Sequence, residues 1–391
     1  MLLPYYVFFG FFGIASILDY LKCEYEVYLL KRFCFLGGLI LILFFVGLRY
    51  KLASDWMSYT VMYEYTPSII NIDFDSIVEP GFNILLSLFK TVGFSFELLV
   101  FCITLYNAIS LFSFINRSQI DYKITFIAVA LVLNVFREID ILRQSLALYT
   151  ILYAFSNKKP NVLKNIMLLV VAISFHYTAI IFVVFYAVKQ IKLTKNILLF
   201  LSISYVVSLF YTIPALSILL EIPNSSSIYI LKAQRLILAV GFQRDISFST
   251  LLNLSFLLLL YFNRNKLKTL TNIELTLVNM FLFYILLCIF CKEIKEVVDR
   301  LSYYFAFGLA FMFCLLPNLV PIKDIKKYIL FVPCLYVFLK LGIHFRNEAA
   351  VYGLTPYRNV LFQKTYNESE ILQRYYHMQE MAREDIFKKH N

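Results

Sequence analysis

The sequence predicts an all-α, polytopic integral membrane protein, on the basis of three observations. Of its 391 residues, 61% are hydrophobic and only 16% are charged, whereas soluble domains carry about 25% charged residues. The mean hydropathy is +0.74, and apolar runs of about 17 residues or more recur, as membrane spans require. The 40 Phe and 29 Tyr residues suit the aromatic belts at membrane interfaces. We expect roughly 10–14 helical membrane segments, including short hairpins and re-entrant helices.

The distribution of Lys and Arg predicts the orientation of these segments, because cytoplasmic loops are rich in both. The first apolar run, 5–21, lacks a positive leader and a cleavage site and is predicted to be a span. The basic residues that follow it place the next loop in the cytoplasm. The acidic loop 49–80 then falls on the outer side. Further segments are predicted over residues 33–48, 81–95 (interfacial or re-entrant), 96–115, 197–220, 247–262, 274–290, 301–316 and 328–344.

This orientation gives a polytopic domain over residues 1–344 and a tail over 345–391. The second outer loop spans 221–246. The tail also falls on the outer side, and its polar last part predicts an interfacial helix. The net charge of +11 lies mostly in inner-loop Lys and Arg, so it indicates membrane topology and no nucleic-acid partner.

Two pairs of apolar arms are too short to be ordinary spans. Arms 124–136 and 144–155 flank the charged stretch 137–143, and arms 165–175 and 177–188 flank His176. A dozen helical residues rise roughly 20 Å, less than the ~30 Å of the hydrocarbon layer. We therefore predict two helical hairpins with their tips near the outer surface, where non-helical backbone must line a protein or water-filled cavity.

The first tip carries four ionisable side chains: Arg137, Glu138, Asp140 and Arg143. Charges within membrane segments are costly and commonly mark a substrate path or a catalytic cavity. We expect Arg143 to act in that cavity. Arg137, Glu138 and Asp140 are expected to form an ion-pair network around it.

Seven arginines fall on the outer side once the cytoplasmic clusters, which are largely lysines, are assigned. A guanidinium binds phosphate oxygens with two donors and tolerates partial desolvation better than an ammonium group. This pattern favours a basic cavity for a diphosphate, although each arginine could instead snorkel to an interface or pair with a nearby acid. The outer arginines are Arg49, Arg137, Arg143, Arg235, Arg244, Arg300 and Arg358.

His176 is the first candidate for a general base, because a neutral imidazole accepts a proton near pH 7. Asp55 and Glu79 are rival bases on the same side. Asp73 and Asp75 form a DxD pair, a weak indication of a metal site. Cys288 and Cys291, inside a predicted span and without a second Cys or His pair, are read as packing residues.

Several short motifs, spread in order over residues 45–305 and followed by one late motif, resemble those of the EpsG/Wzy-type polysaccharide polymerases of bacterial envelopes. The motifs are Gly47-Leu48-Arg49, Ser54-Asp55-Trp56 with Tyr59, Glu79-Pro80-Gly81-Phe82, Leu142-Arg143-Gln144-Ser145-Leu146-Ala147, Ser174-Phe175-His176-Tyr177-Thr178, Asp299-Arg300-Leu301-Ser302-Tyr303-Tyr304 and Pro356-Tyr357.

The resemblance implies a GT-C-like membrane glycosyltransferase that joins oligosaccharide repeats carried on undecaprenyl diphosphate. The protein would be multi-pass in the bacterial cytoplasmic (inner) membrane, with its active site facing the periplasm or outside. Its partners would be the lipid-linked oligosaccharides and the bilayer, and a chain-length regulator protein is a further candidate. The products of such enzymes include O-antigen lipopolysaccharide, capsule and exopolysaccharide.

For such a reaction Arg143 and Arg300 would hold the diphosphate, with Arg49, Arg137 and Arg358 as further contacts. His176 would be the base, with Glu79 or Asp55 as the alternative. We expect no metal cofactor, because preorganised arginines could stabilise the leaving diphosphate; a metal held by Asp73 and Asp75 is the alternative. Two other functions remain open: an O-antigen ligase-like or other GT-C transferase, and a flippase for lipid-linked oligosaccharide.

Overall fold

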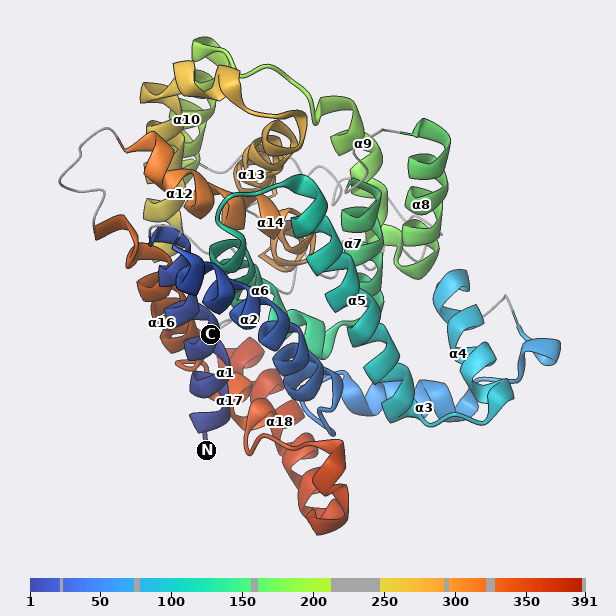
Figure 1. Ribbon diagram of the computed structural model, residues 1–391. Helices are drawn as coiled ribbons and strands as arrows, with labels where there is room; N and C mark the ends of the chain where they lie inside the picture. The colour runs from blue at the N-terminus through green and yellow to red at the C-terminus, as the bar shows by residue number, and fades with distance from the viewer. Residues whose placement is uncertain are drawn as a thin grey trace. The chain divides into compact units, whose positions relative to one another are not determined.

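The apolar runs of the sequence form helices, and the computed structural model is 83% helical (Figure 1). Within the described residues no strand is present, and the only extended pairing is an isolated bridge between Arg49 and Asn359. The described residues are 1–21, 24–73, 78–155, 161–211, 247–291, 295–320 and 328–388. The predicted outer loop 221–246, Asp75, Arg235 and Arg244 lie outside them.

Among the described residues, five helical segments are long and apolar enough to cross a membrane: Leu3–Tyr20, Tyr25–Gly47, Phe96–Ser118, Asn272–Phe290 and Val298–Leu319. Shorter apolar helices of 10–17 residues accompany them: Val162–Phe175, Tyr177–Val188, Lys195–Phe210, Phe248–Phe262 and Val332–His344. The prediction of an all-helical, multi-pass membrane protein is therefore confirmed.

The chain divides into two compact units. Unit 1 comprises residues 1–183 and 330–383, so its two parts are separated in the sequence by unit 2. Its helices are α1 (Leu3–Ala15), α2 (Tyr25–Ile42), α3 (Trp56–Tyr65), α4 (Pro80–Val92), α5 (Phe96–Ser118), α6 (Lys123–Asp140), α7 (Leu142–Phe155), α8 (Val162–Phe175), α16 (Val332–His344), α17 (Glu348–Leu354) and α18 (Glu368–Lys388), with shorter turns η1 (Ser16–Tyr20), η2 (Leu43–Gly47), η3 (Ile69–Asn71), η4 (Tyr177–Ile180) and η7 (Val360–Thr365).

Aromatic side chains form much of the core of unit 1. On α1, Phe8 and Phe9 are fully buried, and Phe8 stacks on Phe45 with ring centroids 4.3 Å apart. Helix α1 packs against α6 and α16, and α7 lies between α5 and α8 (Figure 1). These contacts bring the beginning of α7 and the end of α8 into one well-packed region.

The tail belongs to unit 1 and packs against the segment after α2. Val360 N donates to Leu48 O at 2.7 Å, and Tyr50 N donates to Arg358 O at 3.0 Å. The predicted helix in the polar last part of the tail is α18, and its Ile371 and Met378 are buried. The tail is thus a structural part of the unit that contains the Arg137–Arg143 stretch.

Unit 2 comprises residues 184–329 and 384–391 and contains α10 (Lys195–Phe210), α12 (Phe248–Phe262), η6 (Arg264–Thr269), α13 (Asn272–Phe290) and α14 (Lys295–Leu319). Helix α9 (Ile181–Val188) crosses the boundary between the units. A Cβ at Gly308 would lie 2.3 Å from the Phe281 nitrogen, so glycine lets the α13 and α14 backbones touch, as small residues do between membrane helices.

The two predicted hairpin tips differ in detail from the sequence prediction. Residues 137–140 continue helix α6, and only Ile141 separates α6 from α7. The second break is sharper: His176 has extended backbone angles, φ −158° and ψ 120°, between α8 and η4. Helix α14 begins at Lys295, before the predicted start of the 301–316 segment.

Candidate active site

A buried carboxylate, Glu79, joins two of the predicted site residues. Glu79 is 4% exposed. Its Oε2 accepts a hydrogen bond and ion pair from Arg143 Nη1, and its Oε1 lies 2.6 Å from His176 Nδ1. The three residues come from three separate elements, and all lie in unit 1. We call them the Glu79 cluster.

Local sequence explains where each member of the cluster stands. Glu79 immediately precedes α4, where Pro80 occupies the first helical turn, a position that proline favours. Arg143 is the second residue of α7, directly after the break at Ile141. His176 ends α8, and its amide donates to Ala172 O at 3.0 Å. Each side chain is therefore fixed by a helix end, where the backbone direction changes.

Gly81 sets the distance between α4 and α8. A Cβ at this position would lie 2.2 Å from Ser174 Oγ and 2.9 Å from the Ser174 carbonyl carbon. Only a residue without a side chain allows this approach. Because Gly81 and Ser174 are each two residues from a cluster member, the close contact holds Glu79 next to His176.

The Gly81→Ala variant tests this arrangement. The added methyl should force α4 away from α8, break the Glu79–His176 hydrogen bond and reduce activity sharply. Gly93→Ala, at the end of α4, is a second comparison: its added Cβ meets no atom within 4 Å, but the left-handed φ of 80° makes alanine strained there. Gly37→Ala, which meets no atom within 4 Å, is the neutral control. Full activity of Gly81→Ala would contradict the assigned contact.

The electrostatics of the cluster keep Glu79 ionised. Burial by itself raises the pKa of the Glu79 carboxyl, but the hydrogen bond with His176 and the charge of Arg143 lower it more. The net result is a pKa below the usual value of about 4.3. The ionised Glu79 then orients the imidazole through Nδ1, which leaves Nε2 as the nitrogen able to accept a proton.

The depressed pKa predicts a pH dependence of stability. The ionised Glu79 contributes stability at pH values above its unfolded-state pKa, and this contribution is lost as the pH falls through its lower folded-state pKa. We therefore expect the thermal unfolding temperature of the detergent-solubilised protein to fall below about pH 4.3, with a smaller acid-induced fall in Glu79→Gln. Equal acid sensitivity in both proteins would contradict this role.

Tyr59 supports Arg143 from the other side. The guanidinium carbon of Arg143 lies 5.8 Å from the centre of the Tyr59 ring, in cation–π range. Tyr59 is 4% exposed, whereas the side chains of Arg143 and His176 retain 27% and 13% exposure. Arg143 and His176 are thus the members of the cluster that a substrate could reach.

The ion-pair partner of Arg143 is more distant in sequence than expected. Instead of Glu138 or Asp140, the partner is Glu79. Glu138 accepts a hydrogen bond from the Tyr149 hydroxyl. Asp140 accepts from the Asp55 amide at 2.7 Å and from Ser54 Oγ, so it anchors the two residues that precede α3.

Two of the other predicted arginines are buried among carbonyl groups. Arg49 is 1% exposed, and its Nη1 donates to Val46 O at 2.6 Å while Nη2 donates to Ile139 O at 3.2 Å. Arg358 is 6% exposed and donates to Tyr50 O and Lys51 O. These contacts join the segment after α2 to the end of α6 and to the tail.

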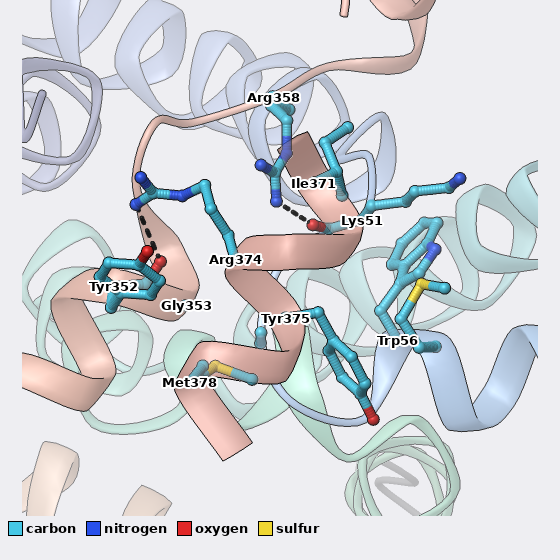
Figure 2. Close-up of a pocket in the computed structure, with 11 residues that line it drawn as sticks. Lys51, Trp56, Tyr352, Gly353, Arg358, Ile371, Arg374, Tyr375 and Met378 are labelled. Carbon is cyan, nitrogen blue, oxygen red and sulfur yellow. Dashed lines mark hydrogen bonds between the residues drawn. The ribbon is translucent and has the colours of Figure 1, made fainter. Parts of the chain in front are cut away.

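Arg374 is a third carbonyl-binding arginine, which the sequence analysis did not single out. It donates to Thr355 O at 2.6 Å and stacks over Tyr352, 4.1 Å from the ring centre. Figure 2 shows Arg358 and Arg374 around a small pocket beside Trp56 and Met378. Arg374 lies on the polar helix α18, where nothing in the sequence distinguished it from the other charged residues.

The remaining predicted residues lie elsewhere. Arg137 is on α6 and is partly buried, and Arg300 is an exposed residue of α14 in unit 2. Asp73 is exposed. In the described ranges no three His, Cys, Asp or Glu side chains gather as metal ligands would.

These features define the class: a helical, multi-pass membrane protein with a buried Glu–His–Arg cluster. The model of the EpsG family matches residues 31–359, and the chain belongs to this family of Wzy-type polysaccharide polymerases. The match spans most of the chain, including the whole Glu79 cluster. Comparisons with curated proteins and with solved structures gave no match.

Proposed function

We propose that this polymerase joins undecaprenyl-diphosphate-linked oligosaccharide repeats at the outer (periplasmic) face of the bacterial cytoplasmic membrane, by a GT-C-like reaction in the Glu79 cluster. The observation that supports this proposal best is that one buried carboxylate holds both an imidazole and a guanidinium, each partly exposed. A base and a cation are the two groups that glycosyl transfer from a diphosphate requires.

The proposed step begins with a hydroxyl at the non-reducing end of one lipid-linked repeat. His176 Nε2 accepts the hydroxyl proton while the oxygen forms a bond to the anomeric carbon of the second glycan. The bond between that carbon and the diphosphate oxygen breaks, and its electron pair leaves with undecaprenyl diphosphate. Arg143 stabilises the charge that grows on the departing diphosphate.

Glu79 is assigned a positioning role in this step. With both oxygens occupied by Arg143 and His176, it is better placed to orient the imidazole and to stabilise its protonated form than to act as the base. Arg300, Arg137, Arg49 and Arg358 stay as candidate phosphate contacts, with Arg49 and Arg358 already engaged by carbonyls.

In vitro polymerisation tests the proposal and its metal requirement together. Purified protein and a defined lipid-linked repeat should yield a ladder of longer glycans, with release of undecaprenyl diphosphate, in excess EDTA. Loss of the ladder in EDTA with rescue by Mg²⁺ or Mn²⁺ would revive the Asp73/Asp75 alternative. Transfer of single repeats to another acceptor would instead indicate a ligase, and transbilayer movement without new glycosidic bonds a flippase.

In cells, a chain-length regulator protein is the partner to test. If such a partner acts on this polymerase, its deletion should alter the glycan length distribution without abolishing elongation.

A further inference from the structure

A second concave site lies at the beginning of α3, apart from the Glu79 cluster. It is a cavity of about 420 Å³, within the size range of small-molecule sites. The described lining residues come from the segment before α3, the end of α6, the end of α16, and the tail helices α17 and α18. Those that bear on its chemistry are Ser54, Asp55, Phe136, Asp140, His344 and Ala350.

The chemistry of this cavity differs from that of the Glu79 cluster. Its described lining includes two carboxylates, Asp55 and Asp140, and no lysine or arginine. Carboxylates accept hydrogen bonds from hydroxyl groups and repel anions. The two carboxylates therefore suit a neutral, hydroxyl-rich ligand.

The lining also includes an aromatic pair, Phe136 and His344. Phe136 and His344 stack with ring centroids 3.8 Å apart and an interplanar angle of 14°. His344 Nε2 is buried and has no hydrogen-bond partner among the described residues. Buried polar atoms without partners are uncommon in folded proteins, and a ligand or water can supply the missing partner.

The cavity is connected to the Glu79 cluster through α3. Asp55 directly precedes this helix, and Asp140 fixes it by accepting from the Asp55 amide at 2.7 Å. Tyr59, four residues further on, lies against Arg143. Four helical residues rise about 6 Å, so one turn of α3 links the carboxylate in the cavity to the cation in the cluster.

We propose that this cavity binds the acceptor glycan, with Asp55 accepting hydrogen bonds from sugar hydroxyls and the Phe136–His344 pair contacting a sugar face. The proposal rests on the proposed function for the identity of the glycan. It assigns Asp55 to acceptor recognition in place of proton transfer. Because α17 and α18 also line the cavity, the tail helps to determine which oligosaccharide repeat is accepted.

The single tryptophan of the chain provides a direct measurement of binding. Trp56 follows Asp55, is 3% exposed and is the only Trp in the sequence. The probe is the lipid-free oligosaccharide repeat of the producing cell, titrated into the purified full-length protein while Trp56 fluorescence is recorded. We expect a saturable change for the natural protein and at least tenfold weaker binding for Asp55→Asn and for Ala350→Phe, which fills the cavity.

Two variants serve as controls for this titration. Asp121→Asn makes the same chemical change at an exposed aspartate outside the cavity and should bind normally. His377→Ala, at an exposed histidine outside the cavity, should also bind normally. In polymerisation assays Asp55→Asn should raise KM for the acceptor with little change in kcat, whereas a base would lower kcat. Elution volume and thermal unfolding show whether each variant is folded.

The outcomes separate this proposal from the proposed function. Equal oligosaccharide affinity in the natural protein, Asp55→Asn and Ala350→Phe overturns the acceptor site, even if the protein polymerises lipid-linked repeats. Displacement of the oligosaccharide by inorganic pyrophosphate also overturns it. Binding that depends on Asp55 in a protein that forms no glycosidic bonds supports the glycan site and overturns the proposed reaction instead.

Discussion

Replacing His176 by alanine should abolish detectable long-chain polysaccharide while single repeats still reach the cell surface. The substitution removes the proposed proton acceptor, and general bases typically contribute about 10²–10⁴-fold to a reaction rate. His176→Gln is the sharper test, because it keeps a polar side chain next to Glu79 but cannot accept the proton. Glycan ladders from cells, and initial rates with purified protein, measure the effect.

The control for His176 is His377→Ala, since His377 is an exposed histidine of α18 with 56% side-chain exposure. It should leave glycan length unchanged. If His176→Gln elongates glycans at the natural rate, the imidazole has no role as a base. If no repeat of any length reaches the surface in the His176 variants, a flippase or a ligase becomes the better interpretation.

Replacing Arg143 should have an effect of similar size. Removing one preorganised group that stabilises transition-state charge costs about 10²–10³-fold in kcat. Arg143→Lys keeps the positive charge but loses the planar, two-donor fork, so we expect it to remain strongly impaired. Measurements of kcat and KM with a defined lipid-linked donor separate this effect from weaker ground-state binding.

Arg143 also pairs with Glu79, so its replacement could act through structure alone. A Glu79→Gln, Arg143→Met double variant addresses this possibility, because it removes both charges together and leaves no unpaired buried charge. If the double variant folds stably yet remains inactive, while the single Glu79→Gln variant keeps activity, the guanidinium acts on the substrate. Arg117→Met, at an exposed arginine near the end of α5, is the matched control. Restored activity in the double variant would contradict the proposed diphosphate contact.

The sequence was sufficient to predict the fold class because membrane spans are recognised from local composition. Apolar runs such as Phe96–Ser118 and Asn272–Phe290 are helices long enough to cross a membrane. Boundaries at charged stretches were harder to predict. Residues 137–140 are helical even though they are charged, because Asp140 and Glu138 find partners in Ser54 and Tyr149, and such partners are set by tertiary structure.

The residues of the candidate site could be selected from the sequence, but the contacts between them could not be predicted. Arg143, His176 and Glu79 were selected from the sequence individually, and the structure brings them together. The pairing of Glu79 with both could not be read from spacing, since 64 and 97 residues separate the partners. The carbonyl contacts of Arg49 and the anchoring by Asp140 of the residues that precede α3 depend likewise on packing between distant segments.

Unit 1 is built from two chain segments that are far apart in the sequence, and this has a consequence for biosynthesis. A chain emerges from the ribosome N-terminus first, and its parts fold in that order where they can. The segment around Arg49 pairs through its main chain with Arg358 and Asn359, which are made only after about 300 further residues. The residues around Glu79, Arg143 and His176 are therefore made well before the last segment, whose Ile371 completes the core cluster that contains Phe82 and Leu142.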